Sequence, residues 1–424
     1  MRRPARGAAV ALMAAVLTTA AAEQAPDNPF LGDLPIEMTG FYELRSGYRL
    51  RNDPYEKDMS VMETRLQLGL DSYLDWGDLR VKGDVIGDLV EEQADFDLRE
   101  ANVFLRPLDF MDLKIGRQPL TWGTGDLLFI NDLFPKDWVS FFIGRDVEYL
   151  KAPSDAVKTS FFHDVANVDF VYIPQFDPDR GITGRRVSYY NPMLGRFAGQ
   201  DAIIHTNRPN RWGRDAEYAM RIYQTVNNYE LAVYGYWGYW KSPGGVVPLM
   251  TQAIYPDLDV YGASIRGPVA RGIGNVEVGY YDSEDNRSGH TPTINHSEMR
   301  YLVGYTQEIG RDLTLGLQYY VEQMMNYDRY RRAAPFGPTR DEFRQLATVR
   351  LTRLLMNQNL RVGVFTYIGM SDSDCYMRPN ANYKITDNLA VELGANVFFG
   401  DHRDTFFGQF ENNTNLYAAL RYSF

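Results

Sequence analysis

The chain ends in an alternating stretch that decides its fold, Leu416-Tyr417-Ala418-Ala419-Leu420-Arg421-Tyr422-Ser423-Phe424. Every second residue from Leu416 to Phe424 is apolar or aromatic, whereas Arg421 and Ser423 belong to the other set. Alternation with a period of two predicts a β-strand that has one apolar face. A strand at the end of a chain frays unless a sheet holds it. We therefore expect this strand to belong to a sheet, either in a membrane β-barrel or in a soluble two-sheet sandwich.

The other end of the chain carries the features of an export signal. Three arginines within the first six residues precede an apolar run over residues 8–20, and alanines at 20–22 precede Glu23. A basic start, a short apolar run and small residues are typical of a cleaved signal peptide. We expect cleavage near Ala22, so that residues 1–22 are the signal peptide and residues 23–424 form the mature domain.

The composition is that of a membrane protein whose mean hydropathy is low. Mean hydropathy is -0.37, yet 14% of the residues are aromatic and 29 are tyrosines. No segment after the signal has the roughly 20 consecutive apolar residues that a membrane-spanning helix needs. In a β-barrel only alternate residues face lipid, and aromatic residues collect at the two interfaces. The composition therefore favours a barrel and excludes a helical membrane protein.

Charge and cysteine content exclude several classes of function. Removing the three arginines of the signal changes the formal net charge from -11 to -14, which argues against nucleic acid as a partner. The single cysteine, Cys375, permits no internal disulfide, and no Cys-x-x-Cys-His run is present to attach haem covalently. We expect no cofactor, no metal site and no catalytic residue.

Eighteen alternating segments tile the mature chain. The links between them alternate in length, as in bacterial barrels, where short turns lie on the periplasmic side and long loops on the extracellular side. Short links are expected at 74–78, 107–110, 227–228, 309–312 and 386–388. Longer links are expected near 51–59, 119–145, 176–214, 242–257, 283–297, 323–340 and 400–413, with shorter ones on the same side at 91–95 and 370–374. We predict a single antiparallel barrel of about 18 strands, with an ambiguous phase at 96–106 and a proline, Pro153, interrupting 147–162.

The link 119–145 is the candidate constriction. It is so rich in large apolar residues that it is not expected to stay in water. We expect it to fold inward across the lumen; the alternative is packing on the outer rim or on another subunit. The residues proposed for the constriction are Trp122, Asp126, Asp132, Lys136, Asp137 and Arg145.

Basic residues recur on the polar face of the strands, which would line the lumen. They slightly outnumber the acidic residues of the same face, and basic groups in a low-dielectric channel attract anions. The alternative is a network of paired charges that holds the wall together. The proposed pore-lining residues are Arg45, Arg65, Arg80, Lys82, Lys114, Arg221, Arg300, Arg344 and Arg361.

The link 176–214 is basic in a different way, because it holds seven arginines against three aspartates. Arginine suits the geometry of phosphate and carboxylate groups. This loop would either capture an anionic solute or bridge the phosphates of lipopolysaccharide, and the residues do not separate the two.

Two motifs resemble known outer-membrane proteins. The terminal Phe424, with apolar residues two and four positions before it, resembles the signal read by the outer-membrane assembly machinery. The run Gly116-Arg117-Gln118-Pro119-Leu120-Thr121-Trp122-Gly123, followed by Asp126, Asp132, Pro135 and Asp137, resembles a Gly-x-Gln…Trp-Gly…Asp…Pro-x-Asp signature of proteobacterial porin-like proteins. We link these with the alginate-export and specific-porin barrels. An alginate-type channel implies uronate binding by Arg45, Arg65, Arg300, Arg344 and Arg361.

Together these features predict a porin in the outer membrane of a Gram-negative bacterium, reached by Sec-type export. Only about thirteen residues separate Glu23 from Ile36, so we expect no plug domain and passive passage of small hydrophilic solutes, either anionic or saccharide. Outer-membrane lipid and lipopolysaccharide are expected partners. The sequence also allows a homo-oligomer and a periplasmic or cytochrome partner. The rival functions are a sheath around a cytochrome or lipoprotein, and an outer-membrane enzyme, although none of the five histidines lies in a nucleophile motif.

Overall fold

The structure is a computed structural model that describes residues 35–247, 252–333 and 340–424. The chain separates into two units, Met1–Ile36 and Glu37–Phe424, and the second unit holds the architecture that follows. The expected signal peptide lies outside the described residues. Within the described ranges, no helix has the length and apolar character needed to cross a membrane.

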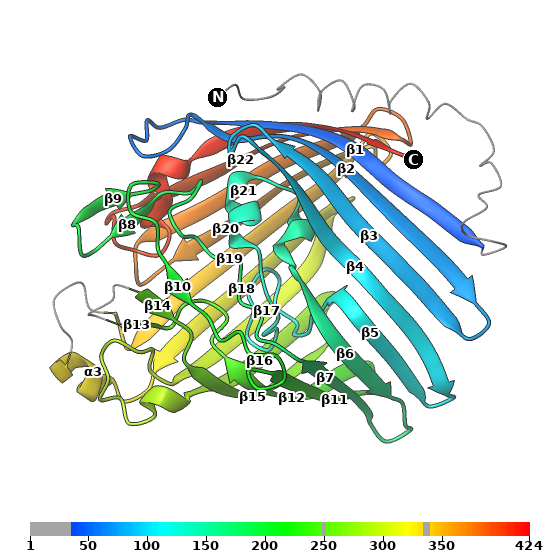
Figure 1. The fold of residues 1–424 in the computed structure, drawn as a ribbon, viewed down its shortest axis with the longest axis horizontal. Helices are drawn as coiled ribbons and strands as arrows, with labels where there is room; N and C mark the ends of the chain where they lie inside the picture. Colours follow the sequence, from blue (N-terminus) through cyan, green and yellow to red (C-terminus); the bar gives the residue numbers. More distant parts are fainter. Residues whose placement is uncertain (1–34, 248–251, 334–339) are drawn as a thin grey trace, which may run out of the picture. The chain divides into compact units, whose positions relative to one another are not determined.

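Eighteen strands form one antiparallel sheet in the described part of the chain (Figure 1). They are β1 (Ile36–Arg49), β2 (Met59–Leu74), β3 (Gly77–Asp88), β4 (Gln93–Leu108), β5 (Met111–Pro119), β6 (Pro153–Phe161), β7 (Asn167–Ile173), β11 (Glu217–Val226), β12 (Tyr229–Tyr239), β15 (Asp257–Val269), β16 (Gly272–Ser283), β17 (Glu298–Gly310), β18 (Leu313–Met324), β19 (Phe343–Leu355), β20 (Leu360–Gly369), β21 (Asp374–Lys384), β22 (Leu389–Gly400) and β23 (Asn415–Ser423).

The first and last strands close the sheet into a barrel. β23 pairs antiparallel with β1, in a register that runs from Phe41 opposite Ser423 to Arg49 opposite Asn415. The backbone of Phe424 exchanges two hydrogen bonds of 3.0 Å with Gly40. The predicted closing strand and the predicted count of eighteen are therefore confirmed, and the soluble sandwich is excluded.

The connections alternate in length as predicted. The two-residue turn between β11 and β12 uses Asn227 and Asn228, both at positive φ (50° and 68°), which is the backbone that a tight hairpin requires. The long loops carry the remaining elements, several of which gather at one end of the barrel in Figure 1. These elements are α2 (Trp138–Ile143), η1 (Val147–Leu150), β8 (Tyr189–Asn191), β9 (Arg196–Ala198), β10 (Thr206–Asn207), β13 (Gly245–Val247), β14 (Gln252–Ile254), η2 (Glu284–Asn286), α3 (Tyr327–Ala333) and η3 (Gly408–Asn413).

The alternation of apolar and polar residues is weak at 96–106 and around Pro153, and the structure explains both. Lys82 faces Glu100 but Gly83 faces Leu98, so β4 contains one extra residue, Arg99, opposite β3. This bulge reverses the phase of β4 and explains the ambiguity at 96–106. β6 begins at Pro153, where a proline is tolerated because the first residue of a strand need not donate to the ladder. The preceding loop therefore ends at 152 and not at 145.

Side chains alternate between the outside and the inside of the barrel. On β1, for example, Glu43 and Arg45 are buried while Leu44 and Tyr48 are exposed on the opposite face. The apolar face is therefore the outer one, as expected of strands that meet lipid. The buried core lies inside the barrel and includes Phe141, Phe142, Tyr376, Phe398 and Phe410.

A first prediction concerns this internal core. Phe142→Ala should cost about 3–5 kcal/mol of unfolding free energy, because it leaves a cavity among three packed rings. Urea unfolding of the refolded chain in lipid vesicles measures this cost. Phe399→Ala is the matched control: Phe399 is half exposed on the other face, where lipid can fill the space, so its loss should be smaller. Equal losses would contradict the internal core.

Candidate functional site

Residues 120–152, which we call the constriction loop, leave the wall after β5 and return at β6. The loop folds into the lumen, as predicted, and Figure 1 draws it within the ring of strands. Its main polar anchor is Glu277 on β16, which is buried. This carboxylate accepts hydrogen bonds from the backbone N–H groups of Thr124 (2.9 Å), Gly125 (3.2 Å) and Asn131 (2.9 Å). The Thr124 hydroxyl and the Asn131 amide also donate to it.

Further bonds tie the constriction loop to the wall beyond β16. Asp126 accepts from Arg350 on β19 (2.8 Å from Nη2), and its side chain is 47% exposed. The hydroxyls of Tyr281 and Tyr367 donate to backbone carbonyls of the loop at 2.5 and 2.8 Å. Because these partners come from β16, β19 and β20, the loop is held along an arc of the wall and not at a single point.

Aromatic packing fixes the middle of the constriction loop. The ring of Phe142 lies 5.3 Å from that of Tyr376, 5.2 Å from Phe398 and 4.9 Å from Phe410. Gly144 ends the short helix α2 at φ 91°, where a Cβ atom would lie 2.4 Å from the Tyr417 ring. Only glycine fits there, which lets the loop pass close to β23.

Four of the proposed constriction residues lie inside the loop and not at an aperture. The Lys136 ammonium donates to Asp132 at 2.9 Å, and both side chains are buried. Asp137 caps α2 by accepting from the backbone of Ser140 at 2.8 Å. Trp122 is half-buried, and its ring lies 5.0 Å from that of Phe134. The structure therefore gives these residues the role of shaping the loop.

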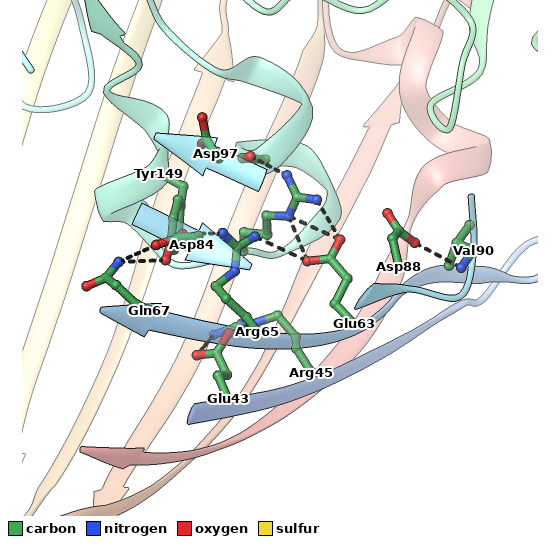
Figure 2. Close-up of polar contacts among 12 residues, drawn as sticks. Glu43, Arg45, Glu63, Arg65, Gln67, Asp84, Asp88, Val90, Asp97 and Tyr149 are labelled. Atoms are coloured by element: carbon green, nitrogen blue, oxygen red, sulfur yellow. Dashed lines mark hydrogen bonds and ion pairs between the residues drawn. The ribbon is translucent and has the colours of Figure 1, made fainter. Parts of the chain in front are cut away.

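Arg145, the last proposed constriction residue, binds the wall at Glu63 on β2. Its guanidinium reaches the carboxylate at 2.6 Å, and two wall groups beside it, Arg65 and Asp84, form a further ion pair at 2.5 Å. Figure 2 shows Glu63, Arg65 and Asp84 converging below Tyr149 of the loop. Burial alone would lower the pKa of Arg145, but the charge of Glu63 raises it above its ordinary value.

Four of the proposed pore-lining arginines have close carboxylate partners. Arg45 and Arg65 are only 3% and 2% exposed. Arg45 pairs with Glu43 at 3.0 Å and donates to the carbonyl of Gly144 at 2.6 Å. The other two are also paired: Arg300 with Glu298 at 2.7 Å, and Arg344 with Glu322 at 3.1 Å. For these four arginines, the structure fits the alternative role, paired charges that hold the wall together, better than the role of a solvated pore lining.

Four other proposed residues lie on the lumen-facing side of β3, β5 and β11. Lys158, which was not among the proposed residues, lies beside them on β6. We call these five residues the open wall. The members of the open wall are Arg80, Lys82, Lys114, Lys158 and Arg221. Among the described contacts, none of its lysines hydrogen-bonds to the constriction loop. Their ion pairs are long, 4.0 Å for Lys114 with Glu100 and 3.5 Å for Lys158 with Asp169. The two arginines are paired more closely, with Asp71 and Glu230. The ninth proposed residue, Arg361, lies exposed near the short-turn end of β20.

Lys114 and Lys158 are direct cross-strand partners on β5 and β6. Like charges in this position repel, so the pair lowers the stability of the sheet. Their side chains remain 28% and 31% exposed to the lumen. The sequence reading missed Lys158 because Pro153 obscured where β6 begins; counting alternation from that proline would have found it.

Residues 174–216, which we call the mouth loop, cross the entrance at the long-loop end. The sequence predicts an external basic loop over 176–214, but two of its arginines turn inward. Arg180 binds Asp97 at 2.9 Å and Asp137 at 3.4 Å, and Arg186 binds Glu63 at 2.8 Å. Burial would lower the pKa of Arg180, but the hydrogen bond to Asp97 and the charge of Asp137 raise it. A cleft of about 360 Å³ separates the two loops from β3 and β4.

No protein-family model and no curated protein matches this sequence. The fold does match solved structures of outer-membrane porins. The crystal structure of Acinetobacter baumannii OccAB4 has a TM-score of 0.56 at 10% identity, covering 94% of this chain and 100% of that chain. Pseudomonas aeruginosa OccD3 (OpdP) has a TM-score of 0.54 at 11% identity, covering 91% of each chain. A. baumannii OccAB3 has a TM-score of 0.52 at 11% identity, covering 92% and 99%. At this identity the likeness is one of fold.

The anchor at Glu277 generates a second prediction. Glu277→Ala should remove five hydrogen bonds to a charged acceptor and cost roughly 3 kcal/mol of stability. It should also make residues 123–131 susceptible to proteases, which mass spectrometry of the fragments would detect. Glu230→Ala is the control, because that carboxylate is 40% exposed and its pair with Arg221 is worth little. A protease-resistant Glu277→Ala loop would contradict the anchor.

Proposed function

We propose that the chain is an outer-membrane channel for the passive passage of small hydrophilic anions, carboxylated solutes foremost. The observation that carries the proposal is the opposed pair Lys114 and Lys158 on the open wall. The pair is costly to the sheet, partly exposed and only loosely neutralised. An anion that binds between the two ammonium groups would relieve their repulsion, so the pair favours anion binding.

The arrangement of the lumen supports a narrow channel. A closed sheet of eighteen strands encloses a space wider than its side chains can fill. The constriction loop contacts the wall from Tyr234 on β12 round to Arg99 on β4. It makes no described hydrogen bond to the lysines of the open wall, so that a passing solute would meet them. Low-dielectric walls strengthen the field of the lysines there, which favours anions over cations.

The placement in the membrane follows from the same proposal. The apolar outer face would meet lipid, the short turns would face the periplasm and the long loops the exterior. Export by the N-terminal signal and lipopolysaccharide as a neighbour belong to this proposal. Docking of the constriction loop favours a channel over the cytochrome or lipoprotein sheath, since the loop takes up space that a threaded partner would need.

The third prediction tests the selectivity. In a planar bilayer under a salt gradient, the wild-type chain should give a reversal potential of the sign that marks anion preference. Lys114→Gln combined with Lys158→Gln should abolish most of this preference, because it removes the unbalanced positive charge of the open wall. Lys57→Gln, at an exposed loop lysine paired with Glu92, should leave the potential unchanged.

The outcomes separate the parts of the proposal. Cation preference of the wild-type chain would refute the anion selectivity while leaving a channel. A bilayer that stays closed to ions and to small organic acids would refute the channel itself.

A further inference from the structure

One buried carboxylate, that of Glu63 on β2, is shared by three arginines from three different elements. Arg145 of the constriction loop approaches it at 2.6 Å, Arg186 of the mouth loop at 2.8 Å and Arg65 of β2 itself at 3.4 Å. Glu63, Arg65 and Arg186 are each at least nine-tenths buried. Figure 2 shows the Glu63 carboxylate beside Arg65, with dashed contacts to its neighbours. Two loops that are far apart along the chain thus meet at one anion.

The mouth loop reaches Glu63 by crossing the entrance. It leaves the wall after β7, yet the backbone N–H of Ser188 donates to Asn413 (3.1 Å), which precedes β23. Arg49 on β1 donates to the backbone carbonyl of Arg186 at 2.5 Å. Arg186 is itself at φ 71°, a strained conformation for a residue with a side chain. Such strain persists only while surrounding contacts hold it.

We propose that Glu63 is a latch, a positioning residue that holds the constriction loop and the mouth loop together against β2 and so sets the width of the channel entrance. The inference rests on the proposed channel function, and it adds the residue that controls access. The mobile ends of the latch are Arg145 and Arg186, because both lie in loops, whereas Arg65 lies on β2 and is also paired with Asp84.

Electrostatics explains why both loops would move together. Without the negative charge of Glu63, three guanidinium groups would lie side by side in a buried site, and buried unpaired charges are strongly unfavourable. Arg186 also binds Asp88, and Arg145 also donates to Ser140. Asp88 and Asp84 would then be two carboxylates for three cations, and Arg145 has no ion pair other than Glu63 among the described contacts. Release of the two loops relieves the repulsion and enlarges the cleft of about 360 Å³ that they line together with β3 and β4.

The first test needs no channel activity. In a Cys375→Ala background, Ser188→Cys places a thiol at a position that is fully buried while the mouth loop is latched. A maleimide reagent should label this thiol slowly in the otherwise wild-type chain and many times faster after Glu63→Gln. Glu43→Gln is the matched control, since Glu43 is an equally buried carboxylate whose partners, Arg45 and Arg421, both lie on the wall.

The second test asks whether the latch controls access. Glu63→Gln should raise single-channel conductance and admit larger neutral polymers. A disulfide between Ser188→Cys and Asn413→Cys should return the oxidised Glu63→Gln chain to the wild-type conductance, and reduction should open it again. If wild-type chain conducts no ions, the proposed function fails, but the labelling test still decides the latch.

A folding control keeps the proposal testable. Heat-modifiable migration on a denaturing gel reports whether each variant forms the barrel. If Glu63→Gln does not fold, Arg186→Gln removes only the mouth-loop arm and should still speed labelling at position 188. Labelling rates that match Glu43→Gln in the folded variants would overturn the proposal.

Discussion

The constraint on which this structure depends is that a closed sheet of eighteen strands cannot fill its own interior. The chain fills it with a loop of unusual apolarity, and the ring of Phe142 packs there against Tyr376, Phe398 and Phe410. The barrel therefore has two apolar surfaces, an outer one for lipid and an inner one for the constriction loop. Both arise from strands whose alternation is ordinary, with aromatic residues added to the inner face of β20 to β23.

The loop divides the lumen electrostatically. Where it docks, inward arginines such as Arg45 and Arg65 find carboxylates at hydrogen-bond distance and lose their exposure. Where it does not, Lys114 and Lys158 face each other with distant counter-charges. The same residue types therefore have different roles on the two sides: paired charges hold the loop on one side, and loosely paired charges are left to meet a solute on the other. The net charge of the chain, which is negative, does not reveal this difference between the two sides of the lumen.

Sequence reasoning predicted the fold and its closing strand well, because period-two alternation and loop lengths are local properties. It also predicted the inward fold of the constriction loop, since so apolar a loop has few other places to go. It did not predict that Asp132 and Lys136 pair within that loop, nor that Glu63 binds arginines more than 80 and 120 residues away. Such pairings depend on which walls face each other across the lumen, which alternation does not encode. Lys158 was missed for a local reason, the proline at the start of β6.

The central claim is that the constriction loop is docked against the inner wall of the barrel. Thr124 and Asn275 are in side-chain contact across this interface, with 3.1 Å between the hydroxyl and the amide nitrogen. The most direct test is a disulfide between Thr124→Cys and Asn275→Cys in a Cys375→Ala chain folded in lipid vesicles. The account predicts that mild oxidation joins the two thiols without displacing the loop. Two thiols that stay reduced and react freely with a water-soluble reagent would contradict it.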